Sequence, residues 1–229
     1  MIAVIGDIHG CFNTLKDLVS KIKKKYPSVN LYCVGDLVDR GNFSYEVMEF
    51  IIRRKIKFTP GNHDYMFYYF IKFPKNHLGR AWLYNGYETT LASYNNRYEK
   101  IAEHIDLITS QPLFINNDDC FISHAGISVY YRSKVAKDFQ TDLNSFKNLI
   151  ESDIDCEHGV LWTRDKLLNL GKLQVIGHTR QPEVLYIKEN NTAYIDTSVY
   201  TGNKLSAVIV EKNKILEIIS IPTYTEDIE

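Results

Sequence analysis

The chain has few cysteines, and none are spaced to share a metal ion or to form a redox pair. Its four cysteines, Cys11, Cys33, Cys120 and Cys156, are scattered through 229 residues without a CxxC motif. This spacing argues against a thiolate zinc site and against a disulfide framework. Cys33 and Cys120 fall within apolar runs, as buried reduced thiols do. The pattern is typical of a cytoplasmic protein.

Long hydrophobic runs and an excess of charge are also missing. No stretch approaches the roughly 20 apolar residues that cross a bilayer. The N-terminal run at residues 1–5 is too short for the core of a signal peptide, and no basic region precedes it. The formal net charge is -1, whereas proteins that bind nucleic acid normally carry a basic excess. We therefore expect neither a membrane nor a nucleic acid as a partner.

No linker, repeat or low-complexity tract divides the chain, so residues 1–229 are predicted to form a single domain. Residues 65–98 are unusually rich in aromatic side chains. We interpret them as a helical segment near the rim of the active site, with Trp82 and Tyr84 as the candidates for lining it. The acidic residues 225–229 are interpreted as a frayed tail. No heptad pattern fixes the oligomeric state, and a monomer is slightly favoured.

Hydrophobic periodicity predicts an α/β protein. Apolar runs at 2–5 and 31–34 are typical of buried strands, and the shorter pattern IKFT at 56–59 is interpreted as a third strand. Helical patterns lie between them, and Asn13 and Ser44 can cap these helices. The βαβαβ order predicts parallel strands joined by right-handed crossovers. Later strand-like runs separated by turns lie at 113–115, 120–123, 173–176, 184–187, 193–195, 205–210 and 215–221. Parallel strands followed by hairpins predict two packed sheets with helices outside.

Five short clusters follow strand-like runs and contain side chains that bind hard metal ions. They are GDIHG at 6–10, GDLVDRG at 35–41, GNHD at 61–64, SHAG at 123–126 and GHT at 177–179. Ligands bind beyond the carboxyl ends of parallel strands, which is where the first clusters fall. A lone Asp or His after a strand is usually a turn former. Five clusters in order, without a thiolate, indicate a two-metal hydrolytic site.

The clusters predict a specific set of metal ligands. Asp7 and His9 are two residues apart, so both can reach one cation. Asp36 has two carboxylate oxygens, which suits it to bridging two ions. The full predicted set is Asp7, His9, Asp36, Asn62, His124 and His178. Carboxylate with imidazole fits manganese, iron or zinc. Two such ions about 3.5–4 Å apart could hold a hydroxide for direct in-line attack on a phosphate.

Four further residues are candidates for catalysis and substrate binding. His63 is the natural proton donor to the leaving oxygen, and Asp39 could hold its ring in orientation. Arg40 carries a planar charge suited to phosphate oxygens. Arg164, in the block WTR at 162–164, could supply a second guanidinium, although a surface salt bridge is a rival interpretation.

Several polar residues have two possible interpretations. Asp64 could assist His63 or cap the following helix. Asp196 could lie behind the ligands or serve a turn. Three histidines lie outside every cluster and are expected to face solvent: His77, His104 and His158.

With these blocks the chain closely resembles the calcineurin-like metallophosphoesterases. Within them it resembles the phosphoprotein phosphatase family, in its compact bacterial and phage-type branch. The blocks span residues 6–179, and GDLVDRG is specific for this family within the superfamily. The resemblance implies an αββα fold, in which two mixed sheets pack as a sandwich flanked by helices. It also implies a dependence on manganese, which commonly supports activity in this branch.

The resemblance also assigns roles to the predicted site residues. Asp7, His9 and Asp36 would hold one metal, and Asp36, Asn62, His124 and His178 would hold the other. His63 would be the general acid partnered by Asp39, while Arg40 and Arg164 would bind the phosphoryl group. Two departures concern substrate preference rather than the metal centre: Tyr87 and Ser198 stand where the family usually has glycine.

The favoured function is hydrolysis of phosphoserine and phosphothreonine in proteins, with phosphotyrosine as a further substrate. The alternative is symmetrical hydrolysis of dinucleoside polyphosphates such as diadenosine tetraphosphate, because close relatives share the metal set. The aromatic segment could then stack an adenine. A non-catalytic scaffold is a third reading, against which the intact ligand set argues. The expected partner is therefore a phosphoprotein or a phosphorylated small molecule.

Overall fold

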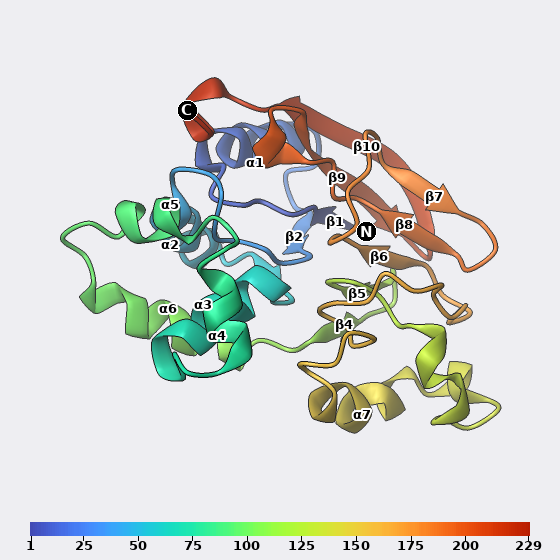
Figure 1. Ribbon diagram of the computed structural model, residues 1–229. Coiled ribbons are helices and arrows are strands. Elements are labelled where there is room, and N and C mark those ends of the chain that lie inside the picture. Colours follow the sequence, from blue (N-terminus) through green and yellow to red (C-terminus); the bar gives the residue numbers. More distant parts are fainter.

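The computed structural model describes residues 1–229 and contains two five-stranded sheets (Figure 1). Each sheet contains both parallel and antiparallel pairs, and helices flank the two of them. The predicted α/β architecture of two mixed sheets is thereby confirmed.

The first sheet combines the two ends of the chain. Its order is β10-β9-β1-β2-β3, with bounds β1 Ile2–Ile5, β2 Asn30–Cys33, β3 Lys57–Phe58, β9 Lys204–Glu211 and β10 Lys214–Pro222. The first three strands are parallel, as the βαβαβ order predicts. The hairpin of β9 and β10 returns from the end of the chain and pairs antiparallel with β1.

The second sheet is built from the middle of the chain. Its order is β4-β5-β6-β8-β7, with bounds β4 Phe114–Asn116, β5 Phe121–Ser123, β6 Gln174–Ile176, β7 Leu185–Ile187 and β8 Thr192–Tyr194. Strands β5, β6 and β8 are parallel to one another, and β4 and β7 form antiparallel edges.

Strand alternation divides the core into layers. On β1, Val4 points into a buried cluster that also contains Ile122 of β5 and Val175 of β6, so this cluster lies between the sheets. Ala3 and Ile5 point the other way, into a larger cluster shared with the helices. Because both faces of β1 are covered, its run is apolar throughout, as in a buried parallel strand.

Most of the helices pack against the first sheet, whereas the short helix at 147–152 lies on the side of the second sheet (Figure 1). Their bounds are α1 Phe12–Lys25, α2 Ser44–Arg54, α3 Asn62–Lys72, α4 His77–Trp82, α5 Tyr87–Ser93, α6 Glu99–Ser110 and α7 Lys147–Ser152. The aromatic-rich residues 65–98 form most of α3 together with α4 and α5. No helix has both the length and the apolar character to cross a membrane.

The C-terminal residues are ordered rather than frayed, which corrects the prediction. Residues Thr225–Asp227 form a 3-10 turn, and the Asp227 side chain is fully buried. Its carboxylate accepts hydrogen bonds from the backbone N–H groups of Asn13 (2.9 Å) and Thr14 (2.8 Å). Asn13 therefore does not cap α1; instead Asp227 satisfies the free donors of its first turn from the far end of the chain. Figure 1 shows the C-terminus beside α1.

One histidine expected to face solvent is instead buried. His104 of α6 is fully enclosed, its Nδ1 lies 2.5 Å from the Tyr94 hydroxyl, and its Nε2 lies 3.1 Å from a Glu49 oxygen. The apolar stripe of α6 continues through this position, with Ile101, Ile105 and Ile108 buried on the same side. The imidazole is tolerated there because both ring nitrogens have partners.

Candidate metal centre

The predicted metal ligands meet at one edge of the two sheets. Each follows the carboxyl end of a strand within a few residues: Asp7 and His9 follow β1, Asp36 follows β2, Asn62 follows β3, His124 follows β5, and His178 follows β6. All six are buried, and all but His124 line a cavity of about 300 Å³. Strand order rather than sequence distance brings them together, because these strands end at the same edge.

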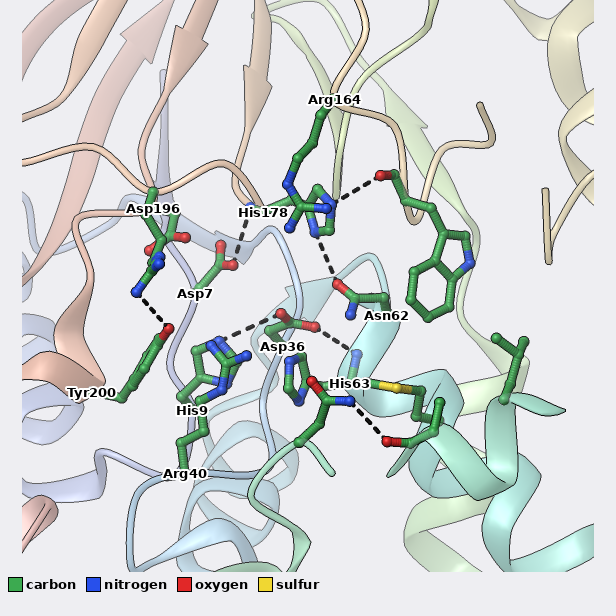
Figure 2. Close-up of a pocket in the computed structure, with 16 residues that line it drawn as sticks. Asp7, His9, Asp36, Arg40, Asn62, His63, Arg164, His178, Asp196 and Tyr200 are labelled. Atoms are coloured by element: carbon green, nitrogen blue, oxygen red, sulfur yellow. Dashed lines mark hydrogen bonds and ion pairs between the residues drawn. The ribbon is translucent and has the colours of Figure 1, made fainter. Parts of the chain in front are cut away.

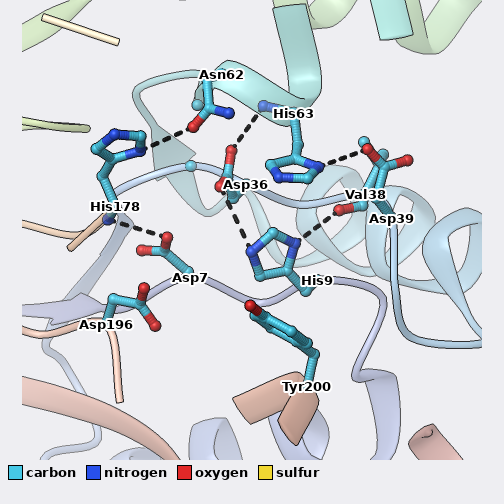
Figure 3. Close-up of polar contacts among 12 residues, drawn as sticks. Asp7, His9, Asp36, Val38, Asp39, Asn62, His63, His178, Asp196 and Tyr200 are labelled. Atoms are coloured by element: carbon cyan, nitrogen blue, oxygen red, sulfur yellow. Dashed lines mark hydrogen bonds and ion pairs between the residues drawn. The ribbon is translucent and has the colours of Figure 1, made fainter. Parts of the chain in front are cut away.

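Asp36 lies between two imidazoles. Its Oδ2 is 3.4 Å from Nε2 of His9 (Figure 3). Its Oδ1 is 3.6 Å from Nε2 of His124. The backbone N–H of His63 donates to Oδ1 at 2.9 Å and fixes the carboxylate. The two oxygens therefore face two different imidazole ligands, as the predicted bridging position requires.

Each imidazole has one nitrogen held by a backbone carbonyl. Nδ1 of His9 donates to the carbonyl of Val38 (3.1 Å), and Nδ1 of His124 donates to that of Val34 (2.9 Å). In His178 the roles are exchanged, and Nε2 donates to the carbonyl of Trp162 (3.0 Å). A carbonyl can only accept, so the other nitrogen of each ring carries a lone pair. The bare nitrogens of His9 and His124 face Asp36 and that of His178 faces Asn62, an arrangement that orients histidine for a metal.

The bare nitrogens converge on the amide oxygen of Asn62. This oxygen is 3.0 Å from Nε2 of His124 and 2.9 Å from Nδ1 of His178. All three atoms are acceptors when the rings are held as described, so no hydrogen bond joins them. A cation placed among them would satisfy all three lone pairs. The donor set therefore fits a divalent metal.

A group of carboxylates supports the same conclusion. Oδ1 of Asp7 is buried without a hydrogen-bond partner, while Oδ2 accepts from the backbone N–H of His178 (3.0 Å). Burial, with the charges of Asp196 and Asp36, raises the pKa of Asp7 well above its usual value. Burial also raises the pKa of Asp196 to about 6. Buried carboxylates that repel one another need a compensating positive charge, which a metal would supply.

The electrostatics keep the imidazoles neutral and Asp36 ionised. Burial lowers the pKa of His9 and His124, and burial with the neighbouring His124 and Arg164 lowers that of His178 to about 3. Burial alone would raise the pKa of Asp36, but the surrounding imidazoles, with His124 foremost, hold it below its usual range. Neutral imidazole and ionised carboxylate are the states that bind metals.

His63 and Asp39 form a buried pair beside this centre. Nδ1 of His63 lies 2.7 Å from Oδ2 of Asp39 (Figure 3). Asp39 also accepts from Nε1 of Trp82 (2.9 and 2.8 Å) and from the hydroxyl of Thr90 (2.8 Å). With Nδ1 engaged, Nε2 is the nitrogen of His63 left for proton transfer. Trp82 is fully buried beneath the pair, and Tyr84 is 88% exposed and lies outside the cavity. The prediction that these two residues line the rim of the site is therefore wrong.

Asp64 and Trp162 support the ligand loops through hydrogen bonds to the backbone or from it. Asp64 accepts from the backbone N–H groups of Gly61 (2.8 Å) and Leu37 (2.9 Å), so it caps α3 and joins two of the ligand loops rather than contacting His63. Trp162 lines the cavity, and its backbone carbonyl orients His178.

The ligand loops contain residues in left-handed backbone conformations. His9, Asp36, Asp39, Arg40 and His178 all have φ between 46° and 73°. Such conformations cost roughly 1–3 kcal/mol each and persist only where the surroundings hold them. They turn the chain sharply at each strand end, so that neighbouring side chains point into the same cavity.

Three arginines line the cavity, one more than predicted. They are Arg40, Arg164 and Arg180. None of the three forms an ion pair with a carboxylate. The one arginine of the protein in an ion pair is Arg97. The rival interpretation of Arg164 as part of a surface salt bridge is therefore wrong. Figure 2 shows Arg164 and Arg40 on opposite sides of the row formed by Asp36 and Asn62.

Asp196, Arg180 and Tyr200 complete the site. A place behind the ligands was one of two interpretations left open for Asp196, whereas Arg180 and Tyr200 were not predicted. Asp196 follows β8 just as the other acids follow their strands, so its position was visible in the sequence. Arg180 lies two residues after His178, and Tyr200 lies in a 3-10 turn, Val199–Thr201. The Tyr200 ring packs edge-on against His9 at 4.9 Å between centroids, a contact that no local sequence signal indicates.

The ligand atoms fall into two groups that share Asp36. Those of His9, Asp36 and His63 lie within 4.8 Å of one another, as do those of Asp7, Asp36 and His124. The first group contains His63 where the resemblance placed Asp7. His63 is therefore close enough either to bind a metal or to deliver a proton, and its predicted role as the acid stays a prediction.

A mixed double sheet with this donor set at its edge defines a metallophosphoesterase. The calcineurin-like phosphoesterase family model matches residues 1–215, and the chain belongs to that family. Members of this family depend on a dinuclear metal centre, which agrees with the two ligand groups sharing Asp36.

The chain is also similar to individual bacterial proteins and to solved structures. The chain is 31% identical to a bis(5'-nucleosyl)-tetraphosphatase PrpE [asymmetrical] of Bacillus mycoides, over 96% of this chain and 93% of the relative. It is 29% identical to a protein of the same name from Halalkalibacterium halodurans, with the same coverage. The structure of a cold-active protein-tyrosine phosphatase of a psychrophilic Shewanella superposes with a TM-score of 0.67 at 20% identity, covering 97% of this chain and 80% of that one. The last similarity concerns the fold alone.

Proposed function

We propose that the protein hydrolyses dinucleoside polyphosphates such as diadenosine tetraphosphate. The observation that carries the proposal is the set of three guanidinium groups around the metal-ligand cavity, none of which has an acidic partner. A phosphomonoester offers one phosphate to such a cavity, whereas a tetraphosphate chain offers several. The names of the similar bacterial proteins support the same substrate class. This replaces protein phosphatase activity as the favoured function.

The expected cleavage is unequal, which also revises the symmetrical alternative. The similar proteins are named as asymmetrical enzymes. An unequal cut of diadenosine tetraphosphate gives ATP and AMP, whereas a symmetrical cut gives two molecules of ADP. The products therefore distinguish the two modes directly.

The residues of the chain can perform the reaction as follows. Arg40 and Arg164 bind the oxygens of the phosphate under attack. One P–O bond of the anhydride breaks, and a P–O bond to the oxygen of water forms. Asp39 holds His63 through Nδ1, so Nε2 can deliver a proton to the departing oxygen while the water loses one. Two divalent ions bound by the predicted ligands would polarise the phosphate and activate water.

Protein dephosphorylation is a second candidate. It is favoured by the apolar side of the cavity, where Met66, Leu78 and Ala81 could contact a peptide. Manganese is the proposed metal for either reaction, and iron or zinc also fits the donors.

A substrate panel tests the proposed function. The manganese-loaded protein is incubated separately with diadenosine tetraphosphate and with a phosphoserine peptide, and the products are resolved by chromatography. We expect ATP and AMP from the dinucleotide at a kcat/KM well above that for the peptide. Release of phosphate from the peptide alone would refute the proposal, and two molecules of ADP would refute unequal cleavage.

A further inference from the structure

A second cavity of about 510 Å³ opens beside the first. The two share Arg164, His178 and Arg180 in their walls. The remaining wall includes Thr179, Gln181, Ser198 and Asn203, and it contains no carboxylate and no large apolar side chain. A cavity lined by guanidinium, hydroxyl and amide groups suits an anion rather than a nucleobase or a peptide side chain.

Arg180 is held at the junction of the two cavities. Its Nη1 donates to the hydroxyl of Tyr200 at 3.0 Å. The guanidinium of Arg40 lies over the face of the same ring, 4.2 Å from its centroid. Tyr200 therefore separates two cations and positions both of them. The other N–H donors of Arg180 have no hydrogen-bond acceptor within the protein, so they are free for a ligand.

The second cavity lies away from the proton donor. Figure 2 shows Arg164 and His63 on opposite sides of the row formed by Asp36 and Asn62. Because His63 would protonate the leaving group, that group departs on the His63 side. A phosphomonoester carries its substituent only on that side, and it has nothing to place in the second cavity. An internal phosphorus of an anhydride chain carries a second substituent, which must leave the first cavity by another route.

We propose that the second cavity binds the non-leaving phosphates of a polyphosphate chain, and that Arg180 is the residue that selects such chains over monoesters. This inference rests on the proposed function, and it adds where the rest of the chain lies. Arg164 would contact the phosphate under attack, and Arg180 the next phosphate along. Ser198 and Asn203 provide further polar contacts in the same wall. Their neutrality leaves Arg180 as the main source of charge beyond the first phosphate.

The test compares two inorganic phosphate anions, one with a single phosphate and one with a chain of three. Inorganic tripolyphosphate and orthophosphate are measured as inhibitors of 4-nitrophenyl phosphate hydrolysis, with free manganese held constant. The same anions are titrated calorimetrically, so that their dissociation constants do not depend on turnover. The proteins are wild type, Arg180→Ala, Arg180→Lys and the control Arg53→Ala, which removes an exposed arginine of α2.

Arg180→Ala should weaken tripolyphosphate binding about tenfold, as loss of one charge-assisted hydrogen bond does. Orthophosphate binding should weaken by less than about threefold, because the first phosphate contacts other groups. Arg180→Lys should recover part of the loss, and Arg53→Ala should match wild type. Equal weakening of both anions by Arg180→Ala, or no weakening of either, would overturn the inference.

Hydrolysis of diadenosine tetraphosphate by the same proteins separates this inference from the proposed function. If wild type cleaves the dinucleotide but Arg180→Ala leaves the tripolyphosphate constant unchanged, the subsite is refuted and the function stands. If wild type does not cleave it but the tripolyphosphate effect is present, the subsite stands and the function is refuted.

Discussion

Nδ1 of His63 lies 2.7 Å from Oδ2 of Asp39, and this carboxylate is itself held by Trp82 and Thr90. Burial raises the pKa of Asp39, although the hydrogen bond from His63 opposes the shift. Removal of either side chain would consequently leave the other buried without its partner, which destabilises the folded protein. This arrangement fixes the direction of the His63 ring from its buried side, while the ring itself lines the cavity.

We predict that His63→Asn keeps its metal ions and loses turnover mainly on poor leaving groups. Proton donation matters most when the departing oxygen is basic, as in a serine phosphate, and contributes typically about 10²–10⁴-fold. The loss with 4-nitrophenyl phosphate should be smaller, because its leaving oxygen is less basic. Metal content by atomic emission, measured beside both rates, checks the assignment. Loss of a metal ion from this variant would show that His63 is a ligand instead.

Gly177→Ala should abolish binding of metal without unfolding the protein. The backbone at Gly177 is not left-handed, but a methyl group there would collide with Oδ1 of Asp7. The carboxylate would have to turn out of the ligand set. Calorimetric titration with manganese measures the effect. Gly202→Ala is the control, because it strains a left-handed turn (φ 84°) while the added methyl group meets only the Ile228 side chain, at an ordinary contact distance of 3.6 Å. Wild-type manganese affinity in Gly177→Ala would contradict the close packing around Asp7.

Asp227→Ala should lower the free energy of unfolding by about 2 kcal/mol, as loss of a good N-cap does. The side chain accepts from the backbone of Asn13 and Thr14 and from the Thr14 hydroxyl (2.6 Å). Its carbonyl oxygen also accepts from the N–H of Asn42, next to the GDLVDRG loop (2.8 Å). Urea unfolding of this variant and of Glu226→Ala, an exposed neighbour, gives the comparison. Equal stabilities would show that the tail is dispensable.

His104 should make stability depend on pH below neutrality. Burial lowers its pKa from 6.5, although the Glu49 carboxylate, and more weakly Glu103, opposes this, and Lys100 and the Tyr45 and Tyr94 rings also lie nearby. Because the folded pKa is the lower one, the unfolded chain gains the proton first as the pH falls. The contribution of His104 to the free energy of unfolding is therefore fully present above the pKa that it has in the unfolded chain, and it is lost as the pH falls below that pKa.

The variant His104→Gln isolates this effect. Between about pH 7 and pH 5, it should lose less unfolding free energy than wild type, since glutamine does not titrate. Urea unfolding of the metal-free proteins at each pH makes the comparison. Parallel pH profiles for the two proteins would contradict the assignment.

The ligand loops could be predicted because each is a local pattern, an apolar strand followed by a polar ligand, with glycine before the ligand in all but the SHAG loop. The parallel order of β1, β2 and β3 then placed Asp7, Asp36 and Asn62 at one edge. The ligands from β5 and β6 needed the pairing of the second sheet as well, which the hairpin pattern indicated only in outline.

Other features depend on contacts between distant segments, which periodicity does not encode. Trp82 is the clearest case. Its aromatic neighbourhood suggested a rim, whereas tertiary packing places it flat against Phe67 and under Asp39. The capping of α1 by Asp227 joins residues more than 200 positions apart. Arg180 and Tyr200 likewise meet only because β6 and β8 are neighbours in the second sheet.

An anomalous-difference map of manganese-loaded crystals tests the central claim most directly. The account predicts two peaks flanking Asp36, one on the side of His9 and one between Asn62, His124 and His178. A single peak remote from Asp36, or none at this edge of the sheets, would contradict it.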